Sequence, residues 1–394
     1  MASVTIVSGK KGDSYQIRSF CGYDAKGKQI VRRKTWKPNP GMTPKQIEKE
    51  LQRQCLLFDQ DCAAGAAAGN IKFQTFAEQW FKEYAEKNLR PRSVARLHDL
   101  EARTYAALGH LRIDKITTRS VQSFINNLSE DGINKRTGGG LSPKTIRHYN
   151  SFISDVMQYG VRMGMIPANP CTNVVLPPLE KKEKDVYTEE EAQAFLQDLI
   201  QEAPSKYQAF FVLAMYGGFR RGEILGLEWE DIDFQSEVIT IRRTSQYTKE
   251  RGVYTDGTKT ASSNRSLKLP AEVFPVLRRH RAEQAAERLR LGDQWQPSNR
   301  VFVAWNGAPM HPNSTYKWLK EFCAQFGHRF IGVHGFRHLN ASLLINAGVD
   351  VRTVSASLGH SQTSTTLNIY SHTFTAAQAK ASEAIGNALQ LKKA

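Results

Sequence analysis

A proline-led, charged segment from Pro177 to Asp185 interrupts the sequence near its middle and constrains the fold more than any other feature. This composition is typical of a linker, and just beyond it Thr188 and Glu191 have the spacing of a capping box that opens a helix. An alanine- and glycine-rich stretch, Cys62 to Gly69, is typical of a flexible joint. Since 394 residues are too many for one ordinary domain, the two joints predict three domains: residues 1–65, 73–178 and 186–394.

The net charge of the chain indicates which kinds of partner it binds. It carries 54 Lys and Arg against 38 Asp and Glu, a formal net charge of +16. Such an excess suits a polyanion, because each neutralised phosphate releases condensed counterions. Ribosomal proteins, nucleases and some membrane-surface proteins share this balance, so the charge favours nucleic acid without selecting it. Apolar residues, 40% of the chain, are enough to build cores and argue against disorder of the whole chain.

Cysteines and apolar runs indicate the compartment. Five scattered cysteines show neither zinc-ligand spacing nor a disulfide framework: Cys21, Cys55, Cys62, Cys171 and Cys323. This pattern fits a reduced, cytosolic protein without a metal centre. The first residues lack the pattern of a signal peptide. The longest apolar stretch, Ala209 to Tyr216, is far shorter than the ~20 residues that span a bilayer, so we expect no membrane segment.

The first domain is predicted to be a small β-sheet covered by a helix. Three short alternating runs within residues 4–33 are separated by turn signals. Thr43-Pro44 and Gln46 form the capping box of a helix whose inward face is Ile47, Leu51, Cys55 and Phe58. The first 40 residues hold nine Lys or Arg and two Asp. This basic unit is either a solvated surface or a DNA-binding sheet, and we favour the sheet because a β-ribbon can enter a major groove.

The second domain is predicted to be helical. Phe76, Trp80 and Tyr84 recur every four residues on its first helix. Ser142-Pro143 caps a long helix with the inward face Ile146, Tyr149, Ile153, Met157 and Val161. The intervening segments are basic, with Arg90, Arg92, Arg96, Arg103, Lys115 and Arg119. Composition fits both a helical DNA clamp and an ordinary helical domain with soluble faces.

The third domain is predicted to mix helices with a strand pair. Val238 to Ile241 alternates as a strand, and Arg265 to Leu269 is predicted to be the strand that pairs with it. Asp256-Gly257 is predicted to be the tight turn between them. The polar, basic span Gln246 to Asp256 is then part of a long hairpin that either embraces DNA or is solvated. The fold class is therefore mainly α and multidomain, with a small N-terminal sheet and a mixed α+β C-terminal domain.

The third domain also offers the groups that metal-free phosphodiester chemistry needs. These are a nucleophile, cations for the non-bridging oxygens, an acid for the leaving 5′ oxygen and a group that takes the nucleophile's proton. Gly217-Gly218-Phe219-Arg220 follows an apolar helix; the glycines permit close approach of a phosphate, and Arg220 presents paired donors. Alone, Arg220 is equally well explained as a surface cation.

Three further pieces follow in order. His334 and Arg337 are three positions apart and share a face if their segment is helical. Leu358-Gly359-His360 comes next, and Tyr370 lies ten residues after His360. Each piece is weak alone, because a lone histidine or tyrosine usually packs or lies on a surface. Their combination and order carry the signal.

The series Arg-x-Gly-Glu, hairpin lysine, His-x-x-Arg, Leu-Gly-His and Tyr resembles the tyrosine recombinases, or phage integrase family, and within it the integrases of phages and conjugative transposons. The motifs occur in the family's order over the last ~200 residues. The helical middle domain is similar to the family's core-binding module, and the basic N-terminal unit resembles arm-site-binding domains. The resemblance implies a site-specific recombinase that integrates and excises a mobile element, using a 3′-phosphotyrosyl intermediate, a Holliday junction and no cofactor.

The resemblance also implies catalytic roles. Arg220 and Arg337 would bind the scissile phosphate, and Tyr370 would be the nucleophile. Lys259 would protonate the leaving 5′ oxygen, although Lys268 lies near the same hairpin and competes for that assignment. An acid is needed there because the leaving alkoxide is far more basic than a tyrosine with its ordinary pKa near 10.

Two histidines and a glutamate complete the implied site. His334 would contact the phosphate and help take the tyrosine proton, and His360 would donate to a non-bridging oxygen or orient the site. Glu223, one turn after Arg220, would orient that arginine. A helix is expected from Phe374 to Leu389, packing on a neighbouring subunit or on its own core.

The implied partners are double-stranded DNA at core and arm attachment sites, further copies of the chain and accessory factors. The resemblance implies a homo-oligomer on DNA, a tetramer in synapsis, with excision or DNA-bending proteins as the accessory factors. It places the protein in the bacterial cytosol, at the nucleoid.

Other functions explain less of the sequence. A type IB topoisomerase-like activity shares the chemistry, and sequence-specific cleavage with a synaptic complex would separate the two. A non-catalytic regulator predicts a damaged constellation, yet every expected residue is present. A metal-dependent transposase needs an acidic trio, and none stands out at a plausible spacing. An RNA-binding or ribosomal protein explains the charge but not the motifs.

Overall fold

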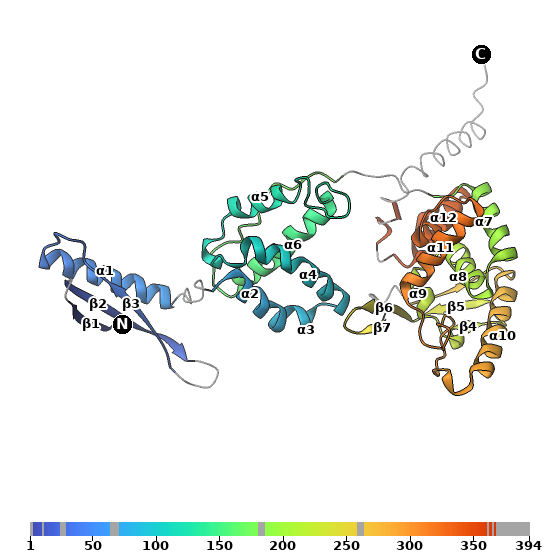
Figure 1. Ribbon diagram of the computed structural model, residues 1–394, viewed down its shortest axis with the longest axis horizontal. Helices are drawn as coiled ribbons and strands as arrows, with labels where there is room; N and C mark the ends of the chain where they lie inside the picture. The colour runs from blue at the N-terminus through green and yellow to red at the C-terminus, as the bar shows by residue number, and fades with distance from the viewer. Residues whose placement is uncertain are drawn as a thin grey trace, which may run out of the picture. The chain divides into compact units, whose positions relative to one another are not determined.

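The computed structural model describes residues 3–9, 12–23, 29–63, 71–179, 186–257, 264–360, 362–364 and 366–367 (Figure 1). The chain divides into two compact units, residues 1–181 and 182–394. The division falls inside the proline-led linker at residues 177–185. Among the described residues, no helix has both the length and the apolar character needed to cross a membrane.

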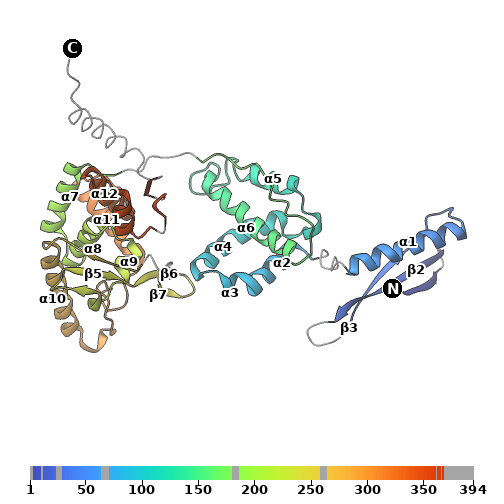
Figure 2. The same cartoon turned by 180° about the vertical axis from the view of Figure 1, so that it is seen from behind.

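The N-terminal part of the first unit is an antiparallel sheet covered by one helix. Its strands lie in the order β1 (Ser3–Gly9), β2 (Gly12–Tyr23), β3 (Gln29–Trp36). Figures 1 and 2 show α1 (Pro44–Ala63) along one face of this sheet. The predicted capping box is confirmed, because the Thr43 amide donates to Gln46 Oε1 at 2.9 Å. Ile17 is fully buried, which places the small core between β2 and the helix.

The rest of the first unit is helical, as predicted. Its main helices are α2 (Phe73–Trp80), α4 (Pro91–Thr104), α5 (Thr118–Asn127) and α6 (Pro143–Arg162). A π-helical turn (Phe81–Ala85) and α3 (Glu86–Asn88) extend α2, and a second π-helical turn (Tyr105–Gly109) and a 3₁₀ turn (Ile113–Lys115) follow α4. Ser142 caps α6, and the predicted inward residues pack into the core, Val161 only in part.

The second unit surrounds one apolar helix. α7 (Glu189–Glu202) begins at the predicted capping box, in which the Thr188 amide donates to Glu191 Oε2 at 2.8 Å. α8 (Ser205–Tyr216) is buried along most of its length, because apolar side chains occupy every face of it. The other α-helices in the part of this unit that the structure describes are α9 (Arg221–Gly226), α10 (Val273–Leu291), α11 (Pro312–Phe326), α12 (Val333–Asn346) and α13 (Val351–Leu358).

The strands of the second unit correct one prediction. β5 (Val238–Ile241) pairs with β8 (Arg265–Lys268) in a sheet of order β4–β5–β8, where β4 is Ile232–Asp233. This pairing confirms the two predicted strands. The predicted turn at Asp256-Gly257 is wrong, because these residues end β7 (Gly252–Gly257), which forms a separate hairpin with β6 (Arg243–Thr248). The span Gln246 to Asp256, expected to belong to one long hairpin between β5 and β8, therefore lies largely in a second, two-stranded sheet.

Candidate active site

The site begins where α8 gives way to α9. Gly218 has φ +57°, a conformation that glycine adopts without strain, and it turns the chain so that Arg220 immediately precedes α9. Asn340 of α12 donates to the carbonyls of Met215 and Tyr216 at 2.9 and 3.0 Å. Since the last carbonyls of a helix have no partner within it, this amide satisfies the end of α8 and ties it to α12.

Arg220 is held by Glu223, as expected. Its backbone amide donates to Glu223 Oε2 at 3.0 Å and its Nη1 to Oε1 at 2.7 Å. Glu223 is 2% exposed and also binds Nη2 of Arg265, from β8, at 2.8 Å. Burial alone would raise the pKa of the Glu223 carboxyl, but the hydrogen bond and charge of Arg265, then the charge of Arg220, hold that pKa below its ordinary value. Glu223 is therefore an anion shared by two arginines.

α12 carries the His-x-x-Arg motif as predicted. His334 lies exposed near its first turn, with its ring 4.8 Å from that of His338. Arg337 is 2% exposed; its Nη1 donates to Gly218 O at 2.9 Å and its Nη2 to Leu358 O at 2.6 Å. This arginine therefore joins the glycine turn beside Arg220 to the end of α13.

The C-terminal end of α13 is where the arginines meet. Three consecutive carbonyls each accept one guanidinium: Ser357 from Arg265 Nε at 2.8 Å, Leu358 from Arg337 Nη2 at 2.6 Å and Gly359 from Arg220 Nη2 at 3.0 Å. Carbonyls at a helix C-terminus lack intrahelical partners and carry partial negative charge, so they attract cations. The Leu-Gly-His motif thus gathers the cations of the site.

His360 follows directly and is half-buried among these charges. Its Nδ1 lies 2.8 Å from Thr366 Oγ1. Desolvation lowers the pKa of the imidazole most, and the charges of Arg337, Arg220 and Arg265 and the ring of His334 lower it further, to about 4. The ring is therefore neutral at pH 7. The same charges show that four of the predicted site residues, Arg220, His334, Arg337 and His360, form one cluster.

The other predicted site residues do not belong to this cluster as the structure describes it. Lys259 and Tyr370, with the helix expected from 374 to 389, lie outside the described residues. Lys268 is exposed on β8, three positions from Arg265. Because alternate residues of a strand face opposite sides, it points away from the side on which Arg265 binds Glu223. Arg265 itself belongs to no motif and was missed; its only signal in the sequence is its place at the start of the predicted strand.

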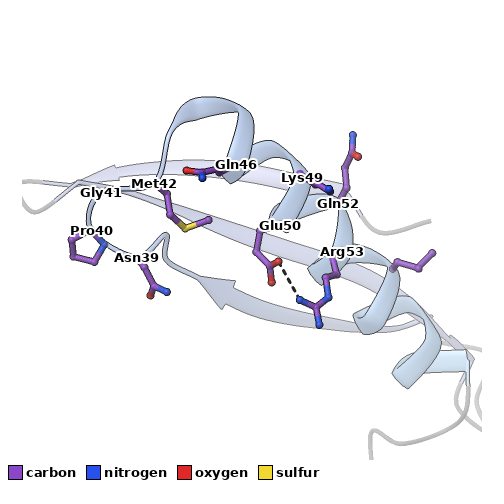
Figure 3. Close-up of a pocket in the computed structure, with 10 residues that line it drawn as sticks. Asn39, Pro40, Gly41, Met42, Gln46, Lys49, Glu50, Gln52 and Arg53 are labelled. Atoms are coloured by element: carbon purple, nitrogen blue, oxygen red, sulfur yellow. Dashed lines mark hydrogen bonds and ion pairs between the residues drawn. The ribbon is translucent and has the colours of Figure 1, made fainter.

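A hollow of about 920 Å³ in the N-terminal part is unrelated to this cluster. Figure 3 shows it between the loop at residues 39–42 and α1, with Glu50 and Arg53 paired at 3.4 Å on its wall. Polar and apolar side chains line it together, among them Gln46, Met42 and Leu56, and none of the predicted catalytic residues belongs to it. The cluster at the end of α13 is therefore the candidate active site.

Two family models match the chain. The phage integrase family matches residues 185–376, and the phage integrase N-terminal SAM-like domain matches residues 72–129. Together they cover more than half of the chain.

Similar proteins span most of the chain. A tyrosine recombinase described as XerC-like, from Caldanaerobacter subterraneus subsp. tengcongensis, is 28% identical over 384 residues, 91% of this chain and 92% of that protein. The ICEBs1 integrase of Bacillus subtilis is 28% identical over 262 residues, 66% of this chain and 68% of the relative.

Solved structures share the fold. The Tn1549 transposon integrase in complex with a circular intermediate DNA has a TM-score of 0.64 at 21% identity, covering 79% of this chain and 99% of that chain. A lambda integrase dimer bound to a COC′ core site has a TM-score of 0.55 at 14% identity, covering 92% and 93%. The motifs, the family matches, the relatives and the fold agree: this chain belongs to the phage integrase family of tyrosine recombinases, enzymes that cleave and rejoin DNA.

Proposed function

We propose that this recombinase integrates and excises a mobile element, through a 3′-phosphotyrosyl intermediate and a Holliday junction. The observation that supports the proposal most is the convergence of Arg220, Arg337 and His360 on the end of α13. Cations and a neutral imidazole held at the end of one short helix can stabilise the negative charge on a phosphodiester in the transition state of strand transfer. The similarity to the ICEBs1 integrase and to phage integrases supports the mobile-element assignment.

The proposed cleavage step is a transesterification. Oη of Tyr370 forms a bond to the scissile phosphorus, and the bond from phosphorus to the 5′ oxygen breaks. Lys259 gives a proton to the leaving 5′ oxygen, and His334 takes the tyrosine proton. Rejoining is the reverse reaction with the 5′ hydroxyl of the partner strand. One phosphodiester replaces another at each step, so no ATP is required.

Arg220 and Arg337 would stabilise the charge on the non-bridging oxygens. Both are fixed before DNA arrives, because each donates to a carbonyl at the end of α13. Preorganised donors need no rearrangement in the transition state, and removing one donor of this kind lowers a rate by about 10²–10³.

His360 would be a hydrogen-bond donor rather than a base. With its pKa at about 4, the ring is neutral at pH 7. If the Thr366 hydroxyl donates to Nδ1, the proton lies on Nε2 and can be given to a non-bridging oxygen.

The first unit would supply two DNA contacts, arm sites through residues 1–65 and core sites through residues 73–178. In the sheet, Ile17 and Ser19 are buried and Ser19 binds Asp59 of α1, so Arg18 faces the opposite side together with its cross-strand partner Arg33. Both arginines are exposed on the face that α1 leaves open.

The core-site assignment rests on a basic surface of α4 and α6. Burial lowers the pKa of His148, and the charges of Arg96 and Lys144 lower it further, which shows that cations gather there. Such a surface fits a DNA backbone. The catalytic domain, residues 186–394, would act on the core site in a tetramer, with accessory excision or bending factors.

A nicked suicide duplex tests the mechanism. The full chain is incubated, in EDTA, with a nicked duplex that carries the candidate attachment site, and a covalent adduct is sought on a denaturing gel. The expected result is an adduct at the 3′ phosphate that disappears in Tyr370→Phe. Tyr216→Phe, in which a half-buried tyrosine at the end of α8 changes, is the control and should still form the adduct.

Two results would contradict the proposal. An adduct that survives in Tyr370→Phe would mean that another residue is the nucleophile. The absence of any adduct on a site that the protein demonstrably binds would mean that the chain binds DNA without cleaving it alone.

A further inference from the structure

Arg265 is a buried arginine with no role in the recombination motifs. Only 8% of its side chain is exposed, and it makes a three-way junction. Nη2 binds Glu223 Oε2 at 2.8 Å, Nε donates to Ser357 O at 2.8 Å, and the guanidinium lies 5.5 Å from the centre of the Phe219 ring. These three contacts reach α9, α13 and the glycine turn.

We infer that Arg265 is a positioning residue of the active site: by binding Glu223 and Ser357 O at once, it fixes Arg220 and His360 relative to each other. The inference rests on the proposed roles of those two residues. Arg265 touches neither the DNA nor the reacting atoms in this scheme. It acts through the carboxylate that holds Arg220 and through the helix end that carries His360.

The contacts of Arg265 do more than hold strand β8 in place. Glu223 binds the guanidinium of Arg220 with Oε1 and that of Arg265 with Oε2, so a single rigid carboxylate fixes the two guanidiniums relative to each other. Ser357 O is the first of the three carbonyls that receive the arginines. An arginine can span both acceptors because its donors form a planar fork, which a lysine cannot reproduce.

Space around the junction is tight. A Cβ added to Gly359 would lie 2.7 Å from Arg265 Nη1, so the loop before His360 is packed directly against the guanidinium. Arg265 is also one of the charges that lower the pKa of His360, together with Arg337, Arg220 and the ring of His334. Geometry and charge can therefore be separated by two different substitutions.

The first variant, Arg265→Lys, keeps the charge and loses the fork. We expect single-turnover cleavage of the suicide duplex to fall by about 10²-fold, because small displacements of catalytic groups have effects of this size. The pKa of His360 should stay near its wild-type value of about 4.

The second variant, Arg265→Met, removes both charge and fork. Cleavage should fall at least as far, and the pKa of His360 should rise toward the ordinary value of 6.5, since one of the cations that lower it is gone. The pKa is measured by NMR titration of the histidine rings in the free protein, with His360→Gln used to assign the signal. This rise reports the loss of the Arg265 charge alone, whereas a residue that only anchored β8 would leave cleavage by Arg265→Lys close to that of the wild type.

Arg300→Lys is the matched control. The side chain of Arg300 is buried to a similar extent, at 6% exposed against 8% for Arg265. It lies 3.6 Å from Glu228 and donates to Leu225 O at 3.3 Å, but it is not among the charges acting on His360. We expect it to lower the unfolding temperature about as much as Arg265→Lys while cleavage stays well above that of the Arg265 variants. A loss of cleavage as large as theirs would overturn the inference, as would wild-type cleavage in both Arg265 variants.

Tyr370→Phe, run on the same substrate, separates the two hypotheses. If Tyr370→Phe abolishes the adduct and the Arg265 variants cleave normally, the positioning role of Arg265 is wrong and the proposed function stands. If the adduct persists in Tyr370→Phe, the assignment of the site fails, whatever the Arg265 variants do.

Discussion

At the scale of single residues, the candidate active site brings three positively charged arginines close together and offsets their mutual repulsion. Three guanidiniums close together repel each other, and a folded chain must offset that repulsion before any phosphate arrives. Here the offset comes from the carboxylate of Glu223 and from the carbonyls of Ser357, Leu358 and Gly359. The free protein therefore already holds the cations in one cluster, and a phosphate would enter a prepared site.

Gly218→Ala tests the turn that connects Arg220 to Arg337. An added Cβ would lie 2.6 Å from Asn340 Oδ1 and 2.9 Å from Leu358 Cδ2, at a φ of +57°. The left-handed conformation alone costs about 1–2 kcal/mol with a side chain, and the overlap adds to this. We expect a lower free energy of unfolding by denaturant and a marked loss of cleavage, since Gly218 O would no longer hold Arg337.

Gly348→Ala provides the comparison. Gly348 has φ +83° in the same unit, and nothing lies within 4 Å of an added Cβ. It should lose stability through backbone strain alone and keep its cleavage activity. Equal loss of cleavage in the two variants would show that the effect of Gly218→Ala comes from general destabilisation.

Sequence alone could assign the residues whose spacing is local. His334 and Arg337 share a helix, and Glu223 lies one turn from Arg220, so their proximity follows from helical periodicity. Arg265 could not be assigned, because its contacts with Glu223 and Ser357 join residues 42 and 92 positions away. Strand alternation places Lys268 on the side of β8 opposite Arg265, whereas the role of Lys259 stays a prediction because this residue lies outside the described residues.

At the scale of elements, helix α9 packs directly against the backbone of strand β6 in the β6–β7 hairpin. A Cβ on Gly226 would lie 2.7 Å from the carbonyl oxygen of Arg243 and 3.0 Å from Cα of Thr244. Arg243 is further held by Glu228 and Asp231, both at 2.7 Å. The helix that follows Arg220 is thus in direct contact with the hairpin through a position that only glycine can occupy.

The hairpin also explains why the turn was misplaced. Asp-Gly is a strong hairpin signal in a sequence, and for this reason Asp256-Gly257 is predicted to be the turn. In the structure Gly252 has φ +67° and lies at the turn, whereas Gly257 pairs with Arg243 at the base of the hairpin. Local propensity cannot weigh the packing of β6 against α9, which selects the register.

Gly226→Ala should loosen that packing. Backbone atoms cannot move aside as a flexible side chain can, so the substitution should lower the free energy of unfolding by about 1–3 kcal/mol, as overpacking usually does. Hydrogen exchange of the β6 and β7 amides should accelerate more than that of β5 and β8. Gly257→Ala, where nothing lies within 4 Å of an added Cβ, should change neither; if it accelerates exchange equally, the close contact with α9 is not the cause.

At the scale of the whole molecule, the excess of positive charge is expected to serve more than one DNA contact. The candidate active site contains Arg220 and Arg337, whereas Arg18 and Arg33 lie on a sheet in the other unit. A protein that holds two DNA sites should lose one contact without losing the other. Arg18→Ala with Arg33→Ala in the full chain should therefore weaken binding to an arm-site duplex and leave cleavage of the core-site suicide duplex unchanged.

The salt dependence of arm-site binding makes that prediction quantitative. Each lost phosphate contact reduces the slope of log K against log salt concentration by about 1, so the double variant should show a slope reduced by about 2. Lys45→Ala with Lys49→Ala removes the same charge from exposed positions on α1, the covered side of the sheet, and should leave the slope nearly unchanged. Equal reductions in both double variants would mean that total charge governs binding, and that the open face of the sheet does not read the arm site.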